Sequence, residues 1–200
     1  SRLNFEVQAS PSGTRARAGR FCTLHSEVLT PVFMPVGTRA TVRSQTVESV
    51  AAAGSQVVLA NTYHLLLRPG PEVFRKMGGI HKWMNWKGSV LTDSGGFQIF
   101  CLPHARTMTE EGAAFKSYID GDKILLTPEL SIEMQRAIGS DILMVLDQCI
   151  ASTAGRDEAD AVRVAGESGV ADASGGEARA LSFCLMRKNK TSTAPGDLWS

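Results

Sequence analysis

The sequence predicts an α/β fold built around a parallel β-sheet. Four short apolar runs alternate with segments that have a helical pattern of apolar residues. Continuous apolar runs are typical of strands that are buried on both faces, as in parallel sheets covered by helices. Polar side chains gather just after these runs, where binding residues of such folds lie. The runs are residues 31–38, 56–60, 89–92 and 142–146.

The region before the first core run predicts a β-hairpin. Residues 3–9 alternate apolar and polar side chains, which indicates a half-buried strand, and residues 21–30 are expected to form the return strand. Arg15, Arg17 and Arg20 lie in the connection. A solvated hairpin arm is the favoured interpretation of these arginines, and contact with phosphate groups is the alternative.

Helix-capping residues mark the elements between the strands. Thr46 is a plausible N-cap for a helix over residues 44–53, and a second helix is expected over residues 71–77. Thr127 followed by Pro128 predicts the start of a third helix, which Gly139 ends. Residues 113–127 are expected to form a β-hairpin around an Asp-Gly turn.

The polar residues after the strands favour a (β/α)-barrel over a doubly wound sheet. Both folds place their chemistry at the carboxyl ends of the strands. No GxGxxG motif follows any run, which argues against a dinucleotide site. We therefore expect residues 1–153 to contain roughly the first half of a TIM (β/α)8 barrel after an N-terminal hairpin region. Residues 154–200 contain few large apolar side chains and are expected to form an atypical, poorly ordered tail.

Composition excludes several classes of protein. The formal net charge is only +1, so a strongly basic nucleic-acid-binding sequence is excluded, although a local basic patch is not. The four cysteines form no CxxC pair and no Cys/His cluster, so no metal ligands are predicted. Free thiols indicate a reducing cytoplasm. No apolar run is long enough to span a bilayer, and no membrane partner is expected.

The stretch around Asp93 is the strongest candidate site. Asp93 follows the run 89–92, the flexible Gly95 and Gly96 allow close backbone approach to a flat ligand, and Phe97 offers a face for stacking. Asp147 follows the neighbouring run and could face Asp93 across a pocket. The two carboxylates could act as acid and base on a glycoside, or accept hydrogen bonds from a guanine-like base with several N–H donors. The plainer alternative is a turn aspartate and a loop cap.

Two further polar residues are expected to be structural. A hydrogen bond to a neighbouring loop is favoured for His64 over a catalytic role. Cys149 is favoured as a small pocket wall because no evident base accompanies it as a nucleophile.

Five motifs resemble those of the tRNA-guanine transglycosylases, also called queuine or prequeuosine tRNA-ribosyltransferases. The resemblance covers residues 3–153, in order and with plausible spacing, and five such motifs together are highly specific. The motifs are PVFMPVGT from Pro31, NTYHL from Asn61, LRPG from Leu67, LTDSGGFQ from Leu91 and SDILMVLD from Ser140.

The resemblance implies a TIM barrel and a pentosyltransferase that acts on tRNA. Such enzymes exchange guanine at the anticodon wobble position for a 7-deazaguanine, the prequeuosine base or queuine, in cytoplasmic queuosine biosynthesis. By this likeness Asp93 is the catalytic acid/base, and Ser94, Gly95, Gly96 and Phe97 line the base pocket. Asp147 would read the amino and ring N–H groups of the base. Cys149 matches the bacterial members, whose substrate is the prequeuosine base.

The sequence also departs from the family pattern. The family's covalent nucleophile is a second aspartate on a later strand, and its zinc ligands are a Cys-rich cluster and a His near the C-terminus. Neither has a counterpart here, so no cofactor is expected in this chain and catalysis by this chain alone is not expected. Homodimers or heterodimers are implied by the family. The alternatives are a non-catalytic subunit that binds tRNA or a partner, and a barrel glycosidase that uses Asp93 and Asp147.

Overall fold

The computed structural model describes residues 4–101, 106–109, 111–146, 155–157 and 180–181, which form three sheets and six helices. The strands are β1 (Phe5–Ala9), β2 (Ala18–Cys22), β3 (Glu27–Thr30), β4 (Val57–Ala60), β5 (Ser89–Thr92), β6 (Arg106–Thr109), β7 (Gly112–Lys116), β8 (Lys123–Leu126), β9 (Ile142–Met144) and β10 (Ala180–Leu181). The helices are α1 (Val47–Ala52), α2 (Thr62–Leu67), α3 (Pro71–Met77), α4 (Ile80–Met84), α5 (Gly96–Phe100) and α6 (Pro128–Ile138).

The central sheet is parallel and has the strand order β10-β9-β5-β4. One face packs against helices in a core that includes Val58, Val90, Phe74 and Ile138. On the other face, Val57 and Ile142 pack against Phe21 and Val28 of the N-terminal sheet. These strands are therefore buried on both faces, as their continuous apolar sequences predict.

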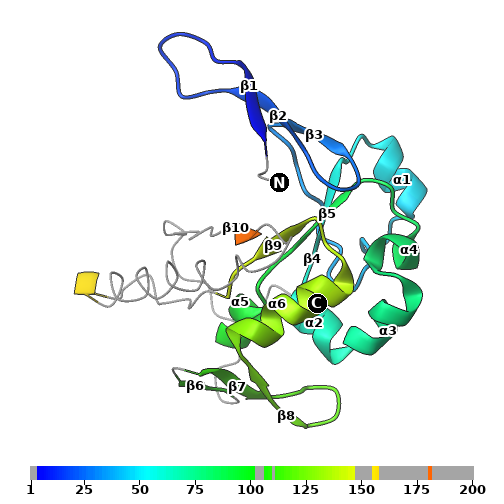
Figure 1. The fold of residues 1–200 in the computed structure, drawn as a ribbon, viewed down its shortest axis with the longest axis vertical. Helices are drawn as coiled ribbons and strands as arrows, with labels where there is room; N and C mark the ends of the chain where they lie inside the picture. Colours follow the sequence, from blue (N-terminus) through cyan, green and yellow to red (C-terminus); the bar gives the residue numbers. More distant parts are fainter. Residues whose placement is uncertain (1–3, 102–105, 110, 147–154, 158–179, 182–200) are drawn as a thin grey trace.

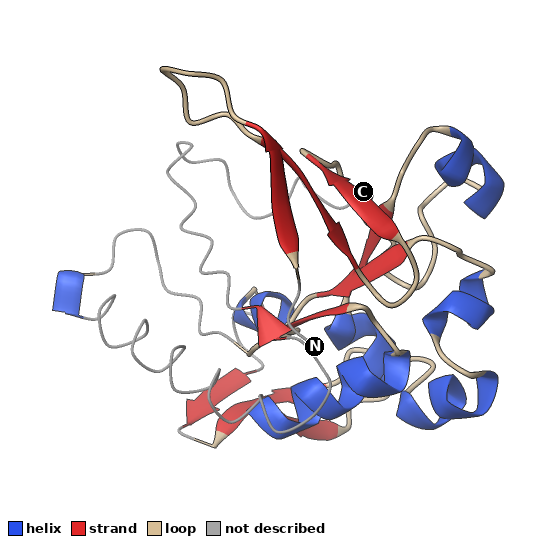
Figure 2. Ribbon diagram, turned by 45° about the horizontal axis from the view of Figure 1, so that its top comes forward, coloured by secondary structure: helices blue, strands red, loops and turns tan. Residues whose placement is uncertain are grey.

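Two antiparallel sheets flank the parallel sheet (Figure 1). The β1-β2-β3 sheet lies at one end, and its β1–β2 connection extends away from the helices (Figure 2). The β6-β7-β8 sheet lies at the other end. Its residues Ala113, Phe115 and Leu126 form a core with Tyr63 of α2 and Ile99 of α5. This core therefore supports α2 and α5, the helices that follow the carboxyl ends of β4 and β5.

The predicted caps are confirmed. The Thr46 side chain accepts a hydrogen bond from the Ser49 N–H at the start of α1, and Thr127 accepts one from Leu130 at the start of α6. Pro128 occupies the first turn of α6, where a missing N–H costs nothing. Gly139 ends α6 with φ 75°, a left-handed conformation that favours glycine.

The run 31–38 was expected to be a buried core strand, and this prediction is wrong for the described structure. The segment makes one parallel bridge, between Val36 and Leu59, and Phe33 and Val36 are 81% and 52% exposed. Pro31 and Pro35 have no N–H to donate to a ladder, which limits its pairing. An apolar sequence alone does not bury a segment; another layer must cover it.

The N-terminal region also differs from the expected two-stranded hairpin. The return segment splits into β2 and β3, because Thr23 closes a turn through hydrogen bonds to Ser26. The strand β1 is exposed along its whole length, whereas a half-buried strand was expected. The last core run forms a shorter strand than predicted, Ile142–Met144.

The predicted α/β class is confirmed, and the barrel is not. The described residues form small sheets and no closed barrel. The half barrel and the domain boundary after residue 153 stay predictions. In the described part of the chain, no helix is both long and apolar enough to cross a membrane.

Candidate functional site

Asp93 lies at the carboxyl edge of the parallel sheet, directly after β5. The neighbouring strand β4 runs parallel to β5 and ends at Ala60. The Asp93 N–H donates to the Ala60 carbonyl oxygen over 3.2 Å. The two strands therefore deliver their following residues, Asp93 and Asn61, to the same place.

Side-chain and backbone donors hold the Asp93 carboxylate. The Asn61 Nδ2 donates to Oδ2 over 2.6 Å, and the Thr62 backbone N–H donates to Oδ1 over 2.7 Å. Gln98 Nε2 donates to Oδ2 over 3.0 Å. The Thr62 hydroxyl also donates to the Asp93 carbonyl oxygen. The bonds from Asn61 and Thr62 span 32 and 31 positions of the sequence, so Asp93 is more than the local turn residue of the plainer interpretation.

Burial and hydrogen bonding have opposite effects on the pKa of the Asp93 carboxyl group. Burial raises the pKa of this carboxyl group above its usual value. Hydrogen bonds from Asn61, Thr62, Gln98 and the Gly95 N–H oppose this effect but leave the pKa raised. A carboxyl group that keeps its proton to higher pH can act as a general acid.

The turn after Asp93 requires glycine at position 95. Gly95 has φ 84°, and a Cβ atom there would lie 3.3 Å from Leu126 Cδ2 and 3.4 Å from the Tyr63 nitrogen. Ser94 is buried, and its carbonyl oxygen accepts a hydrogen bond of 2.7 Å from the Ser131 hydroxyl. Ser94 Oγ accepts from the Gly96 N–H over 3.3 Å. A hydrogen bond thus fixes the tight turn to α6, and Leu126 at the end of β8 lies close to it.

Phe97 and Gln98 give the site groups suited to a flat, polar ligand. Phe97 is 54% exposed on α5, whereas the next residue but one, Ile99, is fully buried. Gln98 Oε1 is buried and has no hydrogen-bond partner among the described residues. An unpaired buried acceptor costs about 1–3 kcal/mol, so this oxygen favours a ligand that brings an N–H donor.

His64 has the structural role that the sequence favoured. Its Nδ1 lies 3.2 Å from the hydroxyl of Tyr118, in the β7–β8 turn, and Arg39 donates to the same hydroxyl over 2.9 Å. Burial, with a smaller contribution from the Arg39 charge, lowers the pKa of His64. The contact connects α2 to the loop that follows β7.

Asp147 and Cys149 lie outside the described residues, so their predicted roles stay predictions. The structure does show how β9 is held next to β5. The buried Gln135 donates from Nε2 to the Met144 carbonyl oxygen over 2.8 Å. Its Oε1 accepts from the Met144 N–H and from the Thr92 hydroxyl, both over 2.9 Å. One side chain of α6 therefore fixes the ends of both strands that precede the predicted aspartates.

A second polar cluster, which the sequence did not predict, lies near the opposite, amino-terminal edge of the sheet. Asp141 precedes β9, and its Oδ1 lies 2.7 Å from His25 Nδ1. Its Oδ2 lies 3.2 Å from His81 Nε2 and accepts from the Val90 N–H over 2.8 Å. Burial opposes ionisation of Asp141, but hydrogen bonds from His81, His25 and Val90 lower its pKa to about 2.

The histidines of this cluster come from distant parts of the sequence. His25 and His81 precede Asp141 by 116 and 60 residues, and no spacing pattern links them. Among the described residues, these three form the one group of His, Cys, Asp or Glu side chains close enough to hold a metal ion. The Cys-rich zinc ligands implied by the resemblance have no counterpart in that group.

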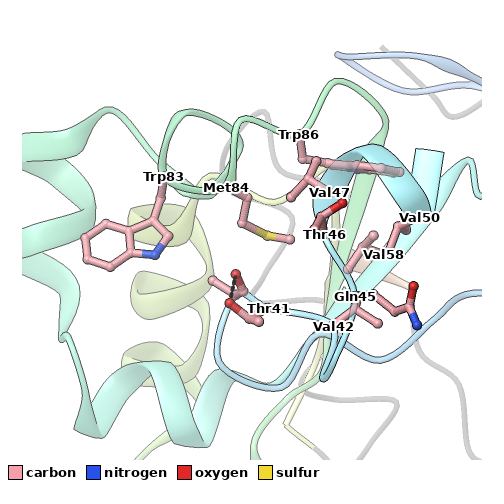
Figure 3. Close-up of a pocket in the computed structure, with 11 residues that line it drawn as sticks. Thr41, Val42, Gln45, Thr46, Val47, Val50, Val58, Trp83, Met84 and Trp86 are labelled. Atoms are coloured by element: carbon pink, nitrogen blue, oxygen red, sulfur yellow. Dashed lines mark hydrogen bonds between the residues drawn. The ribbon is translucent and has the colours of Figure 1, made fainter. Parts of the chain in front are cut away.

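A cavity of about 260 Å³ lies elsewhere, between the 40–50 segment, β4 and α4 (Figure 3). Trp83 and Met84 lie on one side of it, and Val42, Val50 and Val58 lie on the other, where Trp86 is next to Val47. Trp86 is buried and donates from Nε1 to the Ser89 carbonyl oxygen over 3.0 Å, so it is a packing residue. Asp93 does not line this cavity.

Comparison with known proteins agrees with the motifs. The family model described as "Queuine tRNA-ribosyltransferase" matches residues 12–164. A protein of that name from Desulforudis audaxviator is 54% identical over 145 residues, which are 72% of this chain and 39% of the relative.

Two further relatives of the same name give the same result. The protein from Solibacter usitatus is 53% identical over 148 residues, or 74% of this chain and 39% of the relative. The protein from Desulforamulus reducens is 52% identical over 147 residues, or 74% and 40%. The chain thus spans about 40% of the length of the curated relatives that it matches. It belongs to the queuine tRNA-ribosyltransferase family.

Proposed function

We propose that this chain carries the base-recognition side of a tRNA-guanine transglycosylase site. Such a site exchanges guanine at the wobble position of tRNA for a 7-deazaguanine, the prequeuosine base or queuine. The observation that carries this proposal is the half-buried Asp93, four residues before the exposed Phe97: burial raises its pKa, and its carboxylate accepts hydrogen bonds from Asn61, Thr62 and Gln98. The names of the relatives support the same activity.

Asp93 acts as the acid and then as the base in this proposal. When the bond between ribose C1′ and the departing guanine breaks, the neutral carboxylic acid gives its proton to the guanine. The resulting carboxylate then takes a proton from the incoming base as the new bond forms to C1′. The raised pKa keeps the proton available for the first step.

The groups around Asp93 suit a purine-like base. Phe97 supplies an exposed ring for stacking on its face, and the Gln98 Oε1 supplies an acceptor for one of its N–H groups. Ser94, Gly95 and Gly96 form the wall of the pocket. By the family resemblance, Asp147 reads the remaining N–H groups and Cys149 forms part of the wall in the bacterial manner.

Recognition and complete exchange are separable for this chain. In the family a second aspartate on a later strand forms the covalent intermediate with the ribose, and this sequence has no counterpart of it. We therefore expect the 200-residue chain to bind the base and tRNA without turnover. A different polypeptide in a heterodimer, or the rest of a complete barrel, would supply the nucleophile.

Binding of free bases to the 200-residue chain tests the recognition step. Isothermal titration calorimetry with guanine and adenine should show that guanine binds at least tenfold more tightly, because adenine lacks the N1–H donor. The Asp93→Asn variant should lose at least tenfold in guanine affinity. Asp122→Asn, which changes an exposed turn aspartate, is the matched control. Equal binding of both bases, or unchanged affinity in Asp93→Asn, would refute the proposal.

Labelled guanine tests the second step. Incubation of the chain with tRNA should give tRNA binding in a gel-shift assay and no incorporation of the label. Incorporation by the chain alone would show that the nucleophile is present after all. Cleavage of simple glycosides without tRNA would favour the glycosidase alternative instead.

A further inference from the structure

The cluster of His25, His81 and Asp141 contains the donor types of a transition-metal site. Its ligand atoms all lie within 4.8 Å of one another. They come from three separate places: the turn between β2 and β3, helix α4, and the residue before β9. Zn²⁺ and similar divalent transition-metal ions bind two imidazole nitrogens and one carboxylate, with a water as fourth ligand.

The spacing of these atoms is close to the spacing of ligand atoms around a tetrahedrally coordinated ion. Metal–ligand bonds of about 2.0–2.2 Å at tetrahedral angles separate two ligand atoms by about 3.4 Å. The His81 Nε2 to Asp141 Oδ2 distance is 3.2 Å, so this pair needs almost no movement. His25 Nδ1 lies 2.7 Å from the other carboxylate oxygen, Oδ1, so His25 must shift to reach an ion bound at Oδ2.

The surroundings hold the carboxylate and leave one ring adjustable. The Asp141 side chain is 0% exposed, and the Val90 N–H fixes its Oδ2. The His81 side chain is 10% exposed. His25 is 39% exposed, so it has room to move, and water can reach the cluster on its side. The carboxylate and His81 are therefore preorganised, and His25 closes the site.

The His25 ring must reorient for an ion to enter. The rings of His25 and His81 are now stacked, with centroids 3.5 Å apart and 13° between their planes. The lone pairs of stacked rings lie in two nearly parallel planes, so His25 has to rotate until both nitrogens face the same point. Each neutral ring also moves its proton to its other nitrogen, which frees the lone pair that faces Asp141.

We propose that His25, His81 and Asp141 bind Zn²⁺ or a similar divalent transition-metal ion. The bound ion fixes the β2–β3 turn to the amino-terminal edge of the parallel sheet. The turn already contacts this edge through hydrogen bonds between the Ser89 hydroxyl and the hydroxyls of Thr23 and Ser26, of 2.8 and 2.6 Å. Because the ion binds only when His25 is in place, its binding stabilises the docked turn. This site is separate from Asp93 and from the Cys-rich C-terminal ligands that the family resemblance implies.

Cobalt(II) is the probe, because it replaces zinc and gives visible d–d absorption. One equivalent should produce the intense visible bands of a tetrahedral site, and added Zn²⁺ should remove them. The His25→Gln variant changes a half-exposed ring and should lose the bands and at least tenfold in Zn²⁺ affinity by calorimetry. His64→Gln removes a histidine outside the cluster and should keep both.

Two outcomes would overturn the proposal. Strong near-ultraviolet sulfur-to-cobalt charge-transfer bands would assign the ion to cysteines such as Cys22 or Cys101, which are exposed. Unchanged bands in His25→Gln would assign it to another site. If His25→Gln fails to fold, ¹⁵N NMR of the unmodified chain decides. Zn²⁺ should then shift the ring nitrogens of His25 and His81 and leave those of His64 in place, and the absence of such shifts refutes the site.

Discussion

The buried Asp141 predicts a loss of stability in acid that can be worked out from the structure. Its pKa is lowered from 3.8 to about 2 by hydrogen bonds from His81, His25 and the Val90 N–H. A shift of about 1.8 units corresponds to about 2.4 kcal/mol, at about 1.36 kcal/mol per unit. Because the folded-state pKa is the lower one, the unfolded chain binds the proton first as the pH falls. This contribution is therefore complete above about pH 4 and is lost between about pH 4 and pH 2.

Urea unfolding at pH 5 and at pH 2.5, for the unmodified chain and Asp141→Asn, measures this contribution. We expect Asp141→Asn to lose about 2 kcal/mol at pH 5, and to show a correspondingly smaller further loss at pH 2.5. Asp122→Asn, in an exposed turn, should follow the unmodified chain at both values. Parallel acid losses in Asp141→Asn and the unmodified chain would refute the assignment of the low pKa to Asp141.

Three further changes test the supports of the candidate site by urea unfolding. Gly95→Ala should cost about 1–2 kcal/mol, since φ 84° disfavours a side chain and the new Cβ would press on Leu126; no loss would contradict the strained turn. Thr127→Ala should cost about 1 kcal/mol through the lost N-cap of α6, and Thr127→Ser should restore it. Gln135→Leu should cost more than Thr127→Ala, because it removes three hydrogen bonds that Gln135 makes to the Thr92 hydroxyl and to the Met144 N–H and carbonyl oxygen; an equal or smaller cost would contradict that role.

Some features of the candidate site follow from the sequence, and others require the tertiary structure. Asp93 was predictable because a carboxylate after an apolar run lies at the carboxyl edge of a parallel sheet, and its motif matched a family. Its raised pKa depends on the packing that desolvates it, and the opposing hydrogen bonds come from Asn61 and Thr62 at the start of α2. No local sequence pattern reports the burial of a single carboxyl group.

The sequence by itself determined the local elements and the family. Thr46, Thr127 and Gly139 set helix ends because caps act through bonds within a few residues. Only the tertiary structure decided what covers each element and which distant side chains meet. The exposure of Phe33, and the meeting of His25 and Asp141 from 116 residues apart, follow from how the layers pack. Burial and long-range contact are properties of the assembled chain, so a reading of neighbouring residues cannot contain them.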